Sequence, residues 1–250
     1  MSAVSPLPSG PDDPTVPIAA RISAFDWAHV AAQLDAQGFA VLPGLLGGAE
    51  CKSLVALYPQ TELFRSRVVM ARHNFGRGEY QYFCYPLPAI VQSLRTALYP
   101  RLVDVANRWQ EQLGLATRFP ADLAAFLDRC HAAGQTRPTP LLLQYVQDDY
   151  NCLHQDLYGE HVFPLQVAVL LSRPGVDFSG GEFVLTEQRP RMQSRAAVVA
   201  LAQGDAVVFA VHHRPVRGAR GFYRVNLRHG VSTVRSGLRH VAGIVFHDAR

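Results

Sequence analysis

The sequence predicts an α+β domain with a mostly β core, in the form of a β-sandwich or barrel with helices packed outside. Apolar residues before about residue 139 recur at helical spacing, whereas short β-rich runs separated by Gly, Pro, Asp and Ser fill residues 140–250. Of the 250 residues, 48% are hydrophobic and 18% are charged, an ordinary balance for a globular chain with a substantial core. Helices followed by strands favour this fold class, and we expect one domain over residues 21–250.

The first half is predicted to contain four helices. Their apolar spacing covers residues 24–37, 49–58, 89–113 and 120–133, and Gly38 fits a helix stop. The stretch FAVLPGLL, residues 39–46, predicts a strand leading into a turn. The first 17 residues contain five prolines, so we expect residues 1–20 to form a disordered arm.

The second half is predicted to be built from short strands. The runs cover residues 141–146, 163–172, 180–187, 196–202, 204–211, 222–234 and 239–249. Residues 72–88 (RHNFGRGEYQYFCYPLP), which precede these strands, show no regular spacing of apolar residues and are rich in aromatic residues, Arg and Gly. Such a stretch is typical of a loop or short hairpin, and both core packing and a substrate lid fit it.

Net charge, cysteine spacing and the lack of long apolar runs limit the kinds of protein that fit this sequence. The formal charge of +4 suits contact with phosphate or another anion, although a solvated basic surface fits equally well. The four cysteines form no CxxC pair, which argues against a zinc ribbon or a secreted disulfide framework. Because no signal-peptide pattern and no apolar run of about 18 residues occurs, we expect a soluble cytoplasmic protein with no membrane partner.

The chemistry begins at CLHQDLYG, residues 152–159. His154 and Asp156 stand two positions apart, so on a strand both side chains leave the same face. A third ligand must come from elsewhere, and His229 is followed ten residues later by Arg239. Two imidazoles and one carboxylate on one face of an octahedral ion leave three positions open. An Arg just beyond the ion suits a small dicarboxylate, because its guanidinium binds a carboxylate through two hydrogen bonds.

His213 is the competing third ligand. It also precedes arginine-rich sequence, HHRPVRGAR, and in that register Arg220 or Arg224 becomes the anchor. With His213 as the ligand, the run GDAVVF, residues 204–209, leads almost directly into it. The two later predicted strands, residues 222–234 and 239–249, would then contribute neither the third ligand nor the Arg anchor. The sequence favours His229 and leaves His213 open.

The pattern HxD, then a distant His followed ten residues later by Arg, resembles that of the Fe(II)/2-oxoglutarate-dependent dioxygenases. More closely, the chain resembles a bacterial family described as oxygenases acting on nucleic acid by oxidative demethylation of damaged DNA, often labelled prolyl 4-hydroxylase alpha-subunit homologues. The resemblance is carried by LLLQYVQDDYNCLHQDLYGE, FSGGEFVLTEQRPRMQSR and RVNLRHGVSTVRSGLRHVAGIVFHDA. It extends from about Phe25 to the C-terminus and implies a double-stranded β-helix, or jelly roll, for the β core.

The resemblance also implies cofactors and residue roles. Fe(II), the co-substrate 2-oxoglutarate and O₂ are expected, with Arg239 holding the 2-oxoglutarate C5-carboxylate. Tyr145, nine residues before His154, corresponds to a Tyr that related enzymes often place on the neighbouring strand near the co-substrate. Asn151 and Asn226 each stand three residues before a ligand histidine and are further candidate donors. The metal ligands implied are His154, Asp156 and His229.

The implied activity is hydroxylation of a substrate C–H bond, with oxidative demethylation of alkylated DNA or RNA as the favoured reaction. An N-methyl group treated in this way leaves as formaldehyde. Alternatives are a prolyl or other protein side-chain hydroxylase, a small-molecule hydroxylase, and a barrel that acts as a metal-independent sensor or scaffold. A nucleobase enzyme needs stacking aromatics and phosphate-binding Arg near its mouth. Residues 72–85 are the candidate lid, and their candidate contacts are Phe75, Arg77, Tyr80, Tyr82 and Phe83.

Overall fold

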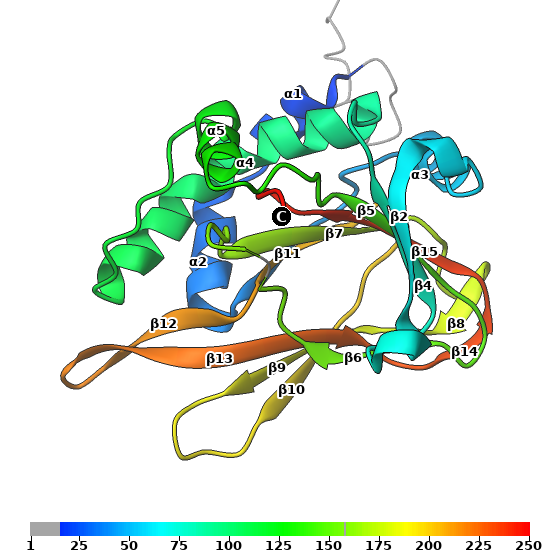
Figure 1. Cartoon of the computed structure of the whole chain (residues 1–250). Coiled ribbons are helices and arrows are strands. Elements are labelled where there is room, and N and C mark those ends of the chain that lie inside the picture. Colours follow the sequence, from blue (N-terminus) through cyan, green and yellow to red (C-terminus); the bar gives the residue numbers. More distant parts are fainter. Residues whose placement is uncertain (1–15, 158) are drawn as a thin grey trace, which may run out of the picture.

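Two facing antiparallel sheets form the β core, and helices cover the outer face of the larger one (Figure 1). The computed structural model describes residues 16–157 and 159–250. The helices are α1 (Ile18–Ala24), α2 (Trp27–Gln37), α3 (Gly48–Val55), α4 (Ala89–Gln112) and α5 (Leu123–Ala132), with short 3-10 turns η1 (Thr61–Leu63) and η2 (Met70–His73).

The larger sheet has seven strands in the order β1-β11-β7-β15-β5-β4-β2. Their bounds are β1 (Phe39–Leu42), β2 (Phe64–Val69), β4 (Glu79–Phe83), β5 (Leu141–Tyr145), β7 (Leu165–Leu170), β11 (Ala206–Ala210) and β15 (Arg239–Ile244). The smaller sheet runs β10-β9-β13-β6-β3, and β12 also pairs with β13. It contains β3 (Gly76–Arg77), β6 (Tyr150–His154), β9 (Phe183–Gln188), β10 (Arg195–Val199), β12 (His213–Gly218) and β13 (Gly221–Val231). A separate ribbon pairs β8 (Phe178–Gly180) with β14 (Val234–Gly237).

The predicted helices are confirmed, and their ends have local causes. The Asp26 side chain accepts a hydrogen bond from the His29 amide at the start of α2, and Asp122 caps α5 in the same way. Helix α2 ends at Gly38, which has φ of 82° and donates its N–H to the Leu34 carbonyl. A Cβ there would also lie 2.4 Å from Leu227 Cδ2, so only glycine fits this turn.

The central strands of the larger sheet are buried on both faces. Val167 and Val169 of β7 belong to the same apolar cluster as Leu98 and Leu102 of α4, on the helical side. Between the sheets, Leu170 of β7 packs instead in a cluster with Tyr145 and Val241. Burial on both faces explains why these strands appear as nearly continuous apolar runs in the sequence.

The jelly-roll core is confirmed as two layers, and the sheets are antiparallel and not closed into a barrel. Of the two alternatives for residues 72–88, a loop or a short hairpin, the structure favours the second, because this stretch contains strands β3 and β4. Antiparallel pairing with β2 and β5 holds β4 on both edges in the larger sheet. Its alternation was hidden because the buried Gln81 is polar; its amide donates to the Tyr58 carbonyl at 2.9 Å.

The predicted disordered arm, residues 1–20, falls mostly outside the described residues. From Ile18 the chain is helical, so the folded region begins earlier than expected. Among the described helices, none combines the length and apolar character that crossing a bilayer requires.

Candidate metal centre and co-substrate cavity

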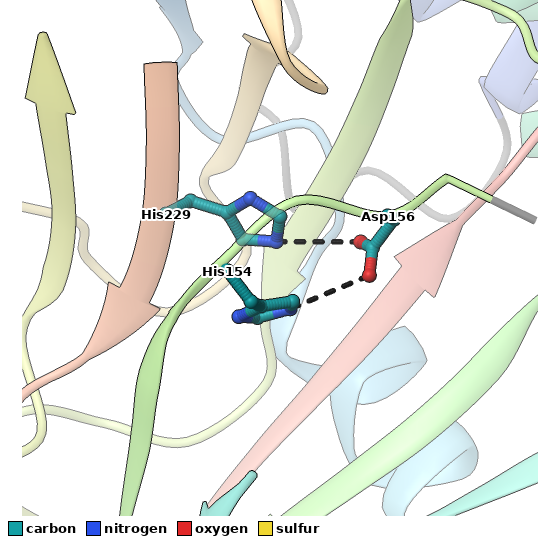
Figure 2. A group of neighbouring side chains, drawn as sticks. All are labelled: His154, Asp156 and His229. Atoms are coloured by element: carbon teal, nitrogen blue, oxygen red, sulfur yellow. Dashed lines mark ion pairs between the residues drawn. The ribbon is translucent and has the colours of Figure 1, made fainter. Parts of the chain in front are cut away.

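Strand pairing brings the three predicted metal ligands together (Figure 2). His154 at the end of β6 lies directly opposite His229 of β13, with ring centroids 4.2 Å apart. Asp156 follows just past the end of β6, and its Oδ1 and Oδ2 lie 3.4 Å from His154 Nε2 and 3.3 Å from His229 Nε2. Within residues 16–157 and 159–250, this is the one group of His, Cys, Asp or Glu side chains with ligand atoms all within 4.8 Å of one another. Such a set fits a divalent metal with open coordination positions.

The histidines are oriented by contacts on their far sides. His154 Nδ1 lies 2.8 Å from the Cys152 carbonyl oxygen, which can only accept, so Nδ1 carries a proton, and in the neutral imidazole Nε2 offers its lone pair. The His229 ring is buried against Phe209, at 4.6 Å between centroids, and Phe183, at 6.1 Å. Both imidazoles therefore present Nε2 towards Asp156.

The charges of the three ligands are coupled. Burial acts to raise the pKa of Asp156, but hydrogen bonds and charges from both histidines outweigh it and hold that pKa well below its usual range. Burial lowers the pKa of His229, and the nearby Asp156 offsets this in part. For His154, burial is outweighed by Asp156, so its pKa is raised. Asp156 is a carboxylate at neutral pH, the form in which it ligates a metal.

Arg239, at the start of β15, is a buried cation with no carboxylate ion pair among the described residues. It is 3% exposed, and its Nε and Nη1 make no hydrogen bond in the part of the chain that the structure describes. Its guanidinium carbon lies 5.4 Å from the ring centre of Tyr145, the residue opposite it on β5. Burial lowers the pKa of Arg239 to about 10, so it stays protonated at neutral pH.

One cavity of about 270 Å³ joins Arg239 to the three ligands. Tyr145 and Asn151 also line it, and Asn151 Nδ2 donates to the Tyr145 hydroxyl at 3.4 Å. The remaining wall is mostly apolar or aromatic and includes Phe75, Tyr80, Tyr82, Leu141, Leu143, Phe183, Phe209 and Val241. A dry, mostly apolar wall with a few converging polar groups is typical of a small-molecule site.

The structure does not bring Asn226 or His213 to this cavity. Asn226 stands three residues before His229 on a regular part of β13, so its exposed side chain faces the opposite side of the sheet. His213 pairs with Asn226 across β12 and β13 and shares that outer face. Asn151 has the same offset from His154, but the β6–β13 register shifts between His229 and Val231 and turns Asn151 into the cavity.

Of the predicted substrate-contact residues in 72–85, some line the cavity and others do not. Tyr80 and Tyr82 line the cavity, and Phe75 lines it while 46% exposed. Phe83 is fully buried in the core beneath the helices and stacks on Phe64 at 4.7 Å, so it is a packing residue. Arg77 is exposed on β3.

Sequence reasoning missed Gln166. This β7 residue lines the cavity, is 4% exposed, and its Nε2 has no hydrogen-bond partner among the described residues. Its register partner on β11 is Phe209, which packs against His229. A single polar residue inside the apolar run LQVAVL was the available signal, because a buried amide needs a partner.

Comparison with known proteins identifies the family. Residues 78–249 match the sequence model of the Oxygenase-NA family, described as an oxygenase catalysing oxidative methylation of damaged DNA. The chain belongs to this family. Two uncharacterized Mycobacterium tuberculosis proteins, MT2286 of strain CDC 1551 and Rv2227 of strain H37Rv, are each 52% identical to this Oxygenase-NA member over 167 residues. Those alignments cover 67% of this chain and 72% of each relative.

Solved structures share the fold of this Oxygenase-NA protein at low sequence identity. A Burkholderia pseudomallei oxidoreductase of the 2OG-Fe(II) oxygenase family superposes with TM-score 0.52 at 20% identity, covering 90% of this chain and 93% of its own. A Trichoplax adhaerens prolyl hydroxylase, solved with a peptide fragment of the hypoxia inducible factor oxygen degradation domain, gives TM-score 0.53 at 15% identity, covering 95% of both chains. Family and fold together make this protein a 2-oxoglutarate-dependent oxygenase that uses Fe(II), 2-oxoglutarate and O₂.

Proposed function

We propose that this oxygenase removes methyl groups from alkylated nucleic acid by oxidation. In this proposal His154, Asp156 and His229 hold Fe(II), and Arg239 anchors 2-oxoglutarate. The observation that carries the site assignment is the buried guanidinium of Arg239, which shares one cavity with the three ligands and has two nitrogens without a partner.

The donor set fits Fe(II). Two imidazole Nε2 atoms and one carboxylate converge from one side, which leaves room for co-substrate and O₂ on the other side of an octahedral ion. An exposed cluster of acids would favour Mg²⁺ or Ca²⁺, whereas imidazole ligands select transition metals. The cavity therefore supports an iron site better than a magnesium site.

The lining groups also fit 2-oxoglutarate. A buried guanidinium without a carboxylate carries a desolvation cost, and a bound carboxylate removes it through two charge-assisted hydrogen bonds. The fully buried Tyr145 hydroxyl and the Asn151 amide lie along the same wall. In this proposal they orient the rest of the co-substrate between Arg239 and the metal ligands.

When bound, Fe(II), 2-oxoglutarate and O₂ supply the oxidation that inserts one oxygen atom into a substrate C–H bond and leaves succinate and CO₂. The apolar wall excludes water from the reacting carbon, and the tyrosine pair Tyr80 and Tyr82 bounds the space left for the substrate. A methyl group on nitrogen becomes N–CH₂OH. Loss of formaldehyde then returns the proton to nitrogen as N–H.

Three observations favour a nucleic-acid substrate over a protein side chain. The family description names damaged DNA, and the net charge of +4 suits a polyanion. Phe75, which stacks on His73 at 5.3 Å between centroids, is exposed where it lines the cavity and is placed to contact a base. The prolyl-hydroxylase alternative rests on fold likeness alone.

The test is an assay of succinate and formaldehyde with Fe(II), 2-oxoglutarate and either N-methylated oligonucleotides or proline-containing peptides. We expect both products from the oligonucleotides, and no turnover by His154→Ala. Succinate formation with the peptides and none with the oligonucleotides would contradict the proposal and indicate a protein side-chain hydroxylase.

The third ligand has its own matched control. We expect His229→Ala to lose Fe(II)-dependent turnover and His213→Ala, on the outer face, to keep it. Full activity in His229→Ala with loss in His213→Ala would show that His213 is the ligand.

A further inference from the structure

None of the helices in residues 16–157 and 159–250 covers the outer face of the smaller sheet (Figure 1). The larger sheet is covered by helices, and α2 lies on the inner side of the β12–β13 hairpin, where Arg214 donates to the Asp35 carbonyl at 2.8 Å. The residues that alternate away from this inner side on β13 are exposed to solvent, as is Arg217 on β12.

The charged residues of this sheet are almost all basic. On the six described strands of the smaller sheet, Glu187 is the single acidic residue, and it is occupied by Arg189 at 3.0 Å and Arg214 at 2.6 Å. Five exposed arginines on these strands have no ion pair in the described part of the chain. Arg77 lies on β3 and Arg195 on β10, and three lie on the outer face of β12 and β13: Arg217, Arg224 and Arg228.

Two exposed apolar side chains lie beside these arginines. Phe222, 42% exposed, stands opposite Arg217 in the β12–β13 register, and Leu153 of the neighbouring β6 is 45% exposed. We call these five residues, Arg217, Phe222, Arg224, Arg228 and Leu153, the arginine face. Guanidinium groups beside exposed aromatic and aliphatic side chains suit a ligand with phosphates and flat rings.

The arginine face borders the cavity. Arg228 immediately precedes His229 and Leu153 immediately precedes His154, so each pair of neighbours points to opposite sides of one sheet. Strand β3 pairs with β6 at Tyr150 and Asn151. One residue further along β6, the Cys152 amide donates to the carbonyl of Phe75, which directly precedes β3. At His154 only β6 separates the arginine face from the metal ligands, and adjacent strands are about 5 Å apart.

We propose that the arginine face binds the backbone of a single-stranded nucleic acid and presents one nucleotide to the cavity around the β6 edge at His154. Arg217, Arg224 and Arg228 contact phosphates, and Phe222 stacks on a base. The proposal rests on the proposed function for its substrate class and adds the surface that holds the polymer. A duplex is not the expected ligand, because a base must leave its stack to enter a cavity of about 270 Å³.

The test is fluorescence anisotropy with a labelled, unmodified oligothymidylate of about 12 nucleotides, titrated at several salt concentrations. The variant Arg217→Gln/Arg224→Gln/Arg228→Gln should bind at least about tenfold more weakly. Its slope of log affinity against log salt should fall by about 2, because each phosphate contact on a single strand contributes about 0.7. The matched control, Arg101→Gln/Arg118→Gln/Arg129→Gln, removes three exposed charges from the helical side of the molecule.

Equal loss in the triple variant and its control, or no loss in either, overturns the proposal while leaving oligonucleotide demethylation intact. Absence of any binding by the wild-type protein also overturns it, and succinate formation with a methylated mononucleotide then decides the proposed function separately. Displacement of the oligothymidylate by polyglutamate at equal charge concentration would indicate an acidic protein partner instead. Normal melting temperatures in both variants exclude misfolding as the cause.

Discussion

Arg239 is a buried charged residue whose Nε and Nη1 have no hydrogen-bond partner among the described residues. A buried, protonated guanidinium with two unpartnered nitrogens is destabilising by itself, and the protein tolerates it at the end of the cavity that holds the metal ligands. Gly181, with φ of 62°, leaves room for it, since a Cβ there would lie 2.9 Å from Arg239 Cδ. In the proposed function, this room lets the side chain receive the carboxylate of 2-oxoglutarate.

We expect Arg239→Lys to raise the KM for 2-oxoglutarate about tenfold or more. A lysine replaces two charge-assisted hydrogen bonds by a single point contact, and one such bond is worth roughly 1.5–3 kcal/mol. The measurement is succinate formation at varied 2-oxoglutarate. Arg235→Lys, an exposed neighbour that pairs with Glu182, serves as the control and should leave the KM unchanged. An unchanged KM in Arg239→Lys would exclude Arg239 as the anchor.

Gln166 is a second residue with an unfilled hydrogen bond, at the part of the cavity wall beside Phe209. We expect Gln166→Leu to raise the KM of the methylated substrate and to leave the KM for 2-oxoglutarate unchanged. Stability should stay equal or rise, because an unsatisfied buried amide is replaced by an apolar group of similar size. Kinetics on both substrates and urea denaturation check this. A shift in the 2-oxoglutarate KM alone would assign Gln166 to the co-substrate.

At the scale of elements, Arg214 joins three parts of the fold. This residue of β12 is 2% exposed and bonds Glu187 of β9 and the backbone of α2 at Asp35. Burial acts to raise the pKa of Glu187, but Arg214 and then Arg189 outweigh it and lower that pKa. The pair thus ties both hairpins of the smaller sheet to a helix.

We expect Arg214→Met to destabilise the protein by roughly 3 kcal/mol at pH 7, since it removes the buried partner of Glu187 and leaves that carboxylate only the half-exposed Arg189. Because the folded pKa of Glu187 is lowered, its contribution is fully present above the unfolded value of about 4.3 and is lost as pH falls through the folded pKa. The difference in unfolding free energy between wild type and variant should therefore shrink on acidification. Urea denaturation at pH 7 and at low pH measures it.

The exposed pair of Arg108 and Asp35 provides the control. Arg108→Met should cost less than about 1 kcal/mol, because water and ions screen a surface pair. An equal loss in both variants would mean that Arg214 contributes no more than a surface charge.

At the scale of the whole molecule, the candidate site spans two sheets that no strand ladder joins. The predicted metal ligands come from β6, β13 and the residues just after β6, whereas Arg239 begins β15 in the larger sheet. A co-substrate anchored by Arg239 beside the metal contacts both sheets at once. Metal and co-substrate are therefore expected to stabilise the fold together.

We expect Mn(II), used as an unreactive substitute for Fe(II), and 2-oxoglutarate to raise the melting temperature more together than the sum of their separate effects. Saturation at about 100 times Kd adds roughly 2.7 kcal/mol, and a protein of this size gains about 2–4 °C per kcal/mol. Differential scanning calorimetry measures the shift. His154→Ala should lose the joint effect, and a full shift in that variant would place the metal elsewhere.

The sequence by itself determined those parts of the site that depend on local geometry. Strand alternation predicted that His154 and Asp156 point the same way, and the strand-rich second half indicated a β core. In the structure Asp156 lies just past the end of β6, with its carboxylate still beside His154. The larger helices followed from apolar spacing and from stops such as Gly38. These features arise within a few neighbouring residues, so no distant contact was needed to predict them.

Only the tertiary structure decided how those local pieces combine. The register shift between β6 and β13 puts Asn151 in the cavity, while regular alternation on β13 sends Asn226, and with it His213, to the outer face. Burial of Gln81 concealed β4, and the cavity position of Gln166 depends on strands that meet across the chain. The physical reason is that strand pairing joins residues far apart in sequence, and a register displaced by one residue exchanges the two faces of a strand.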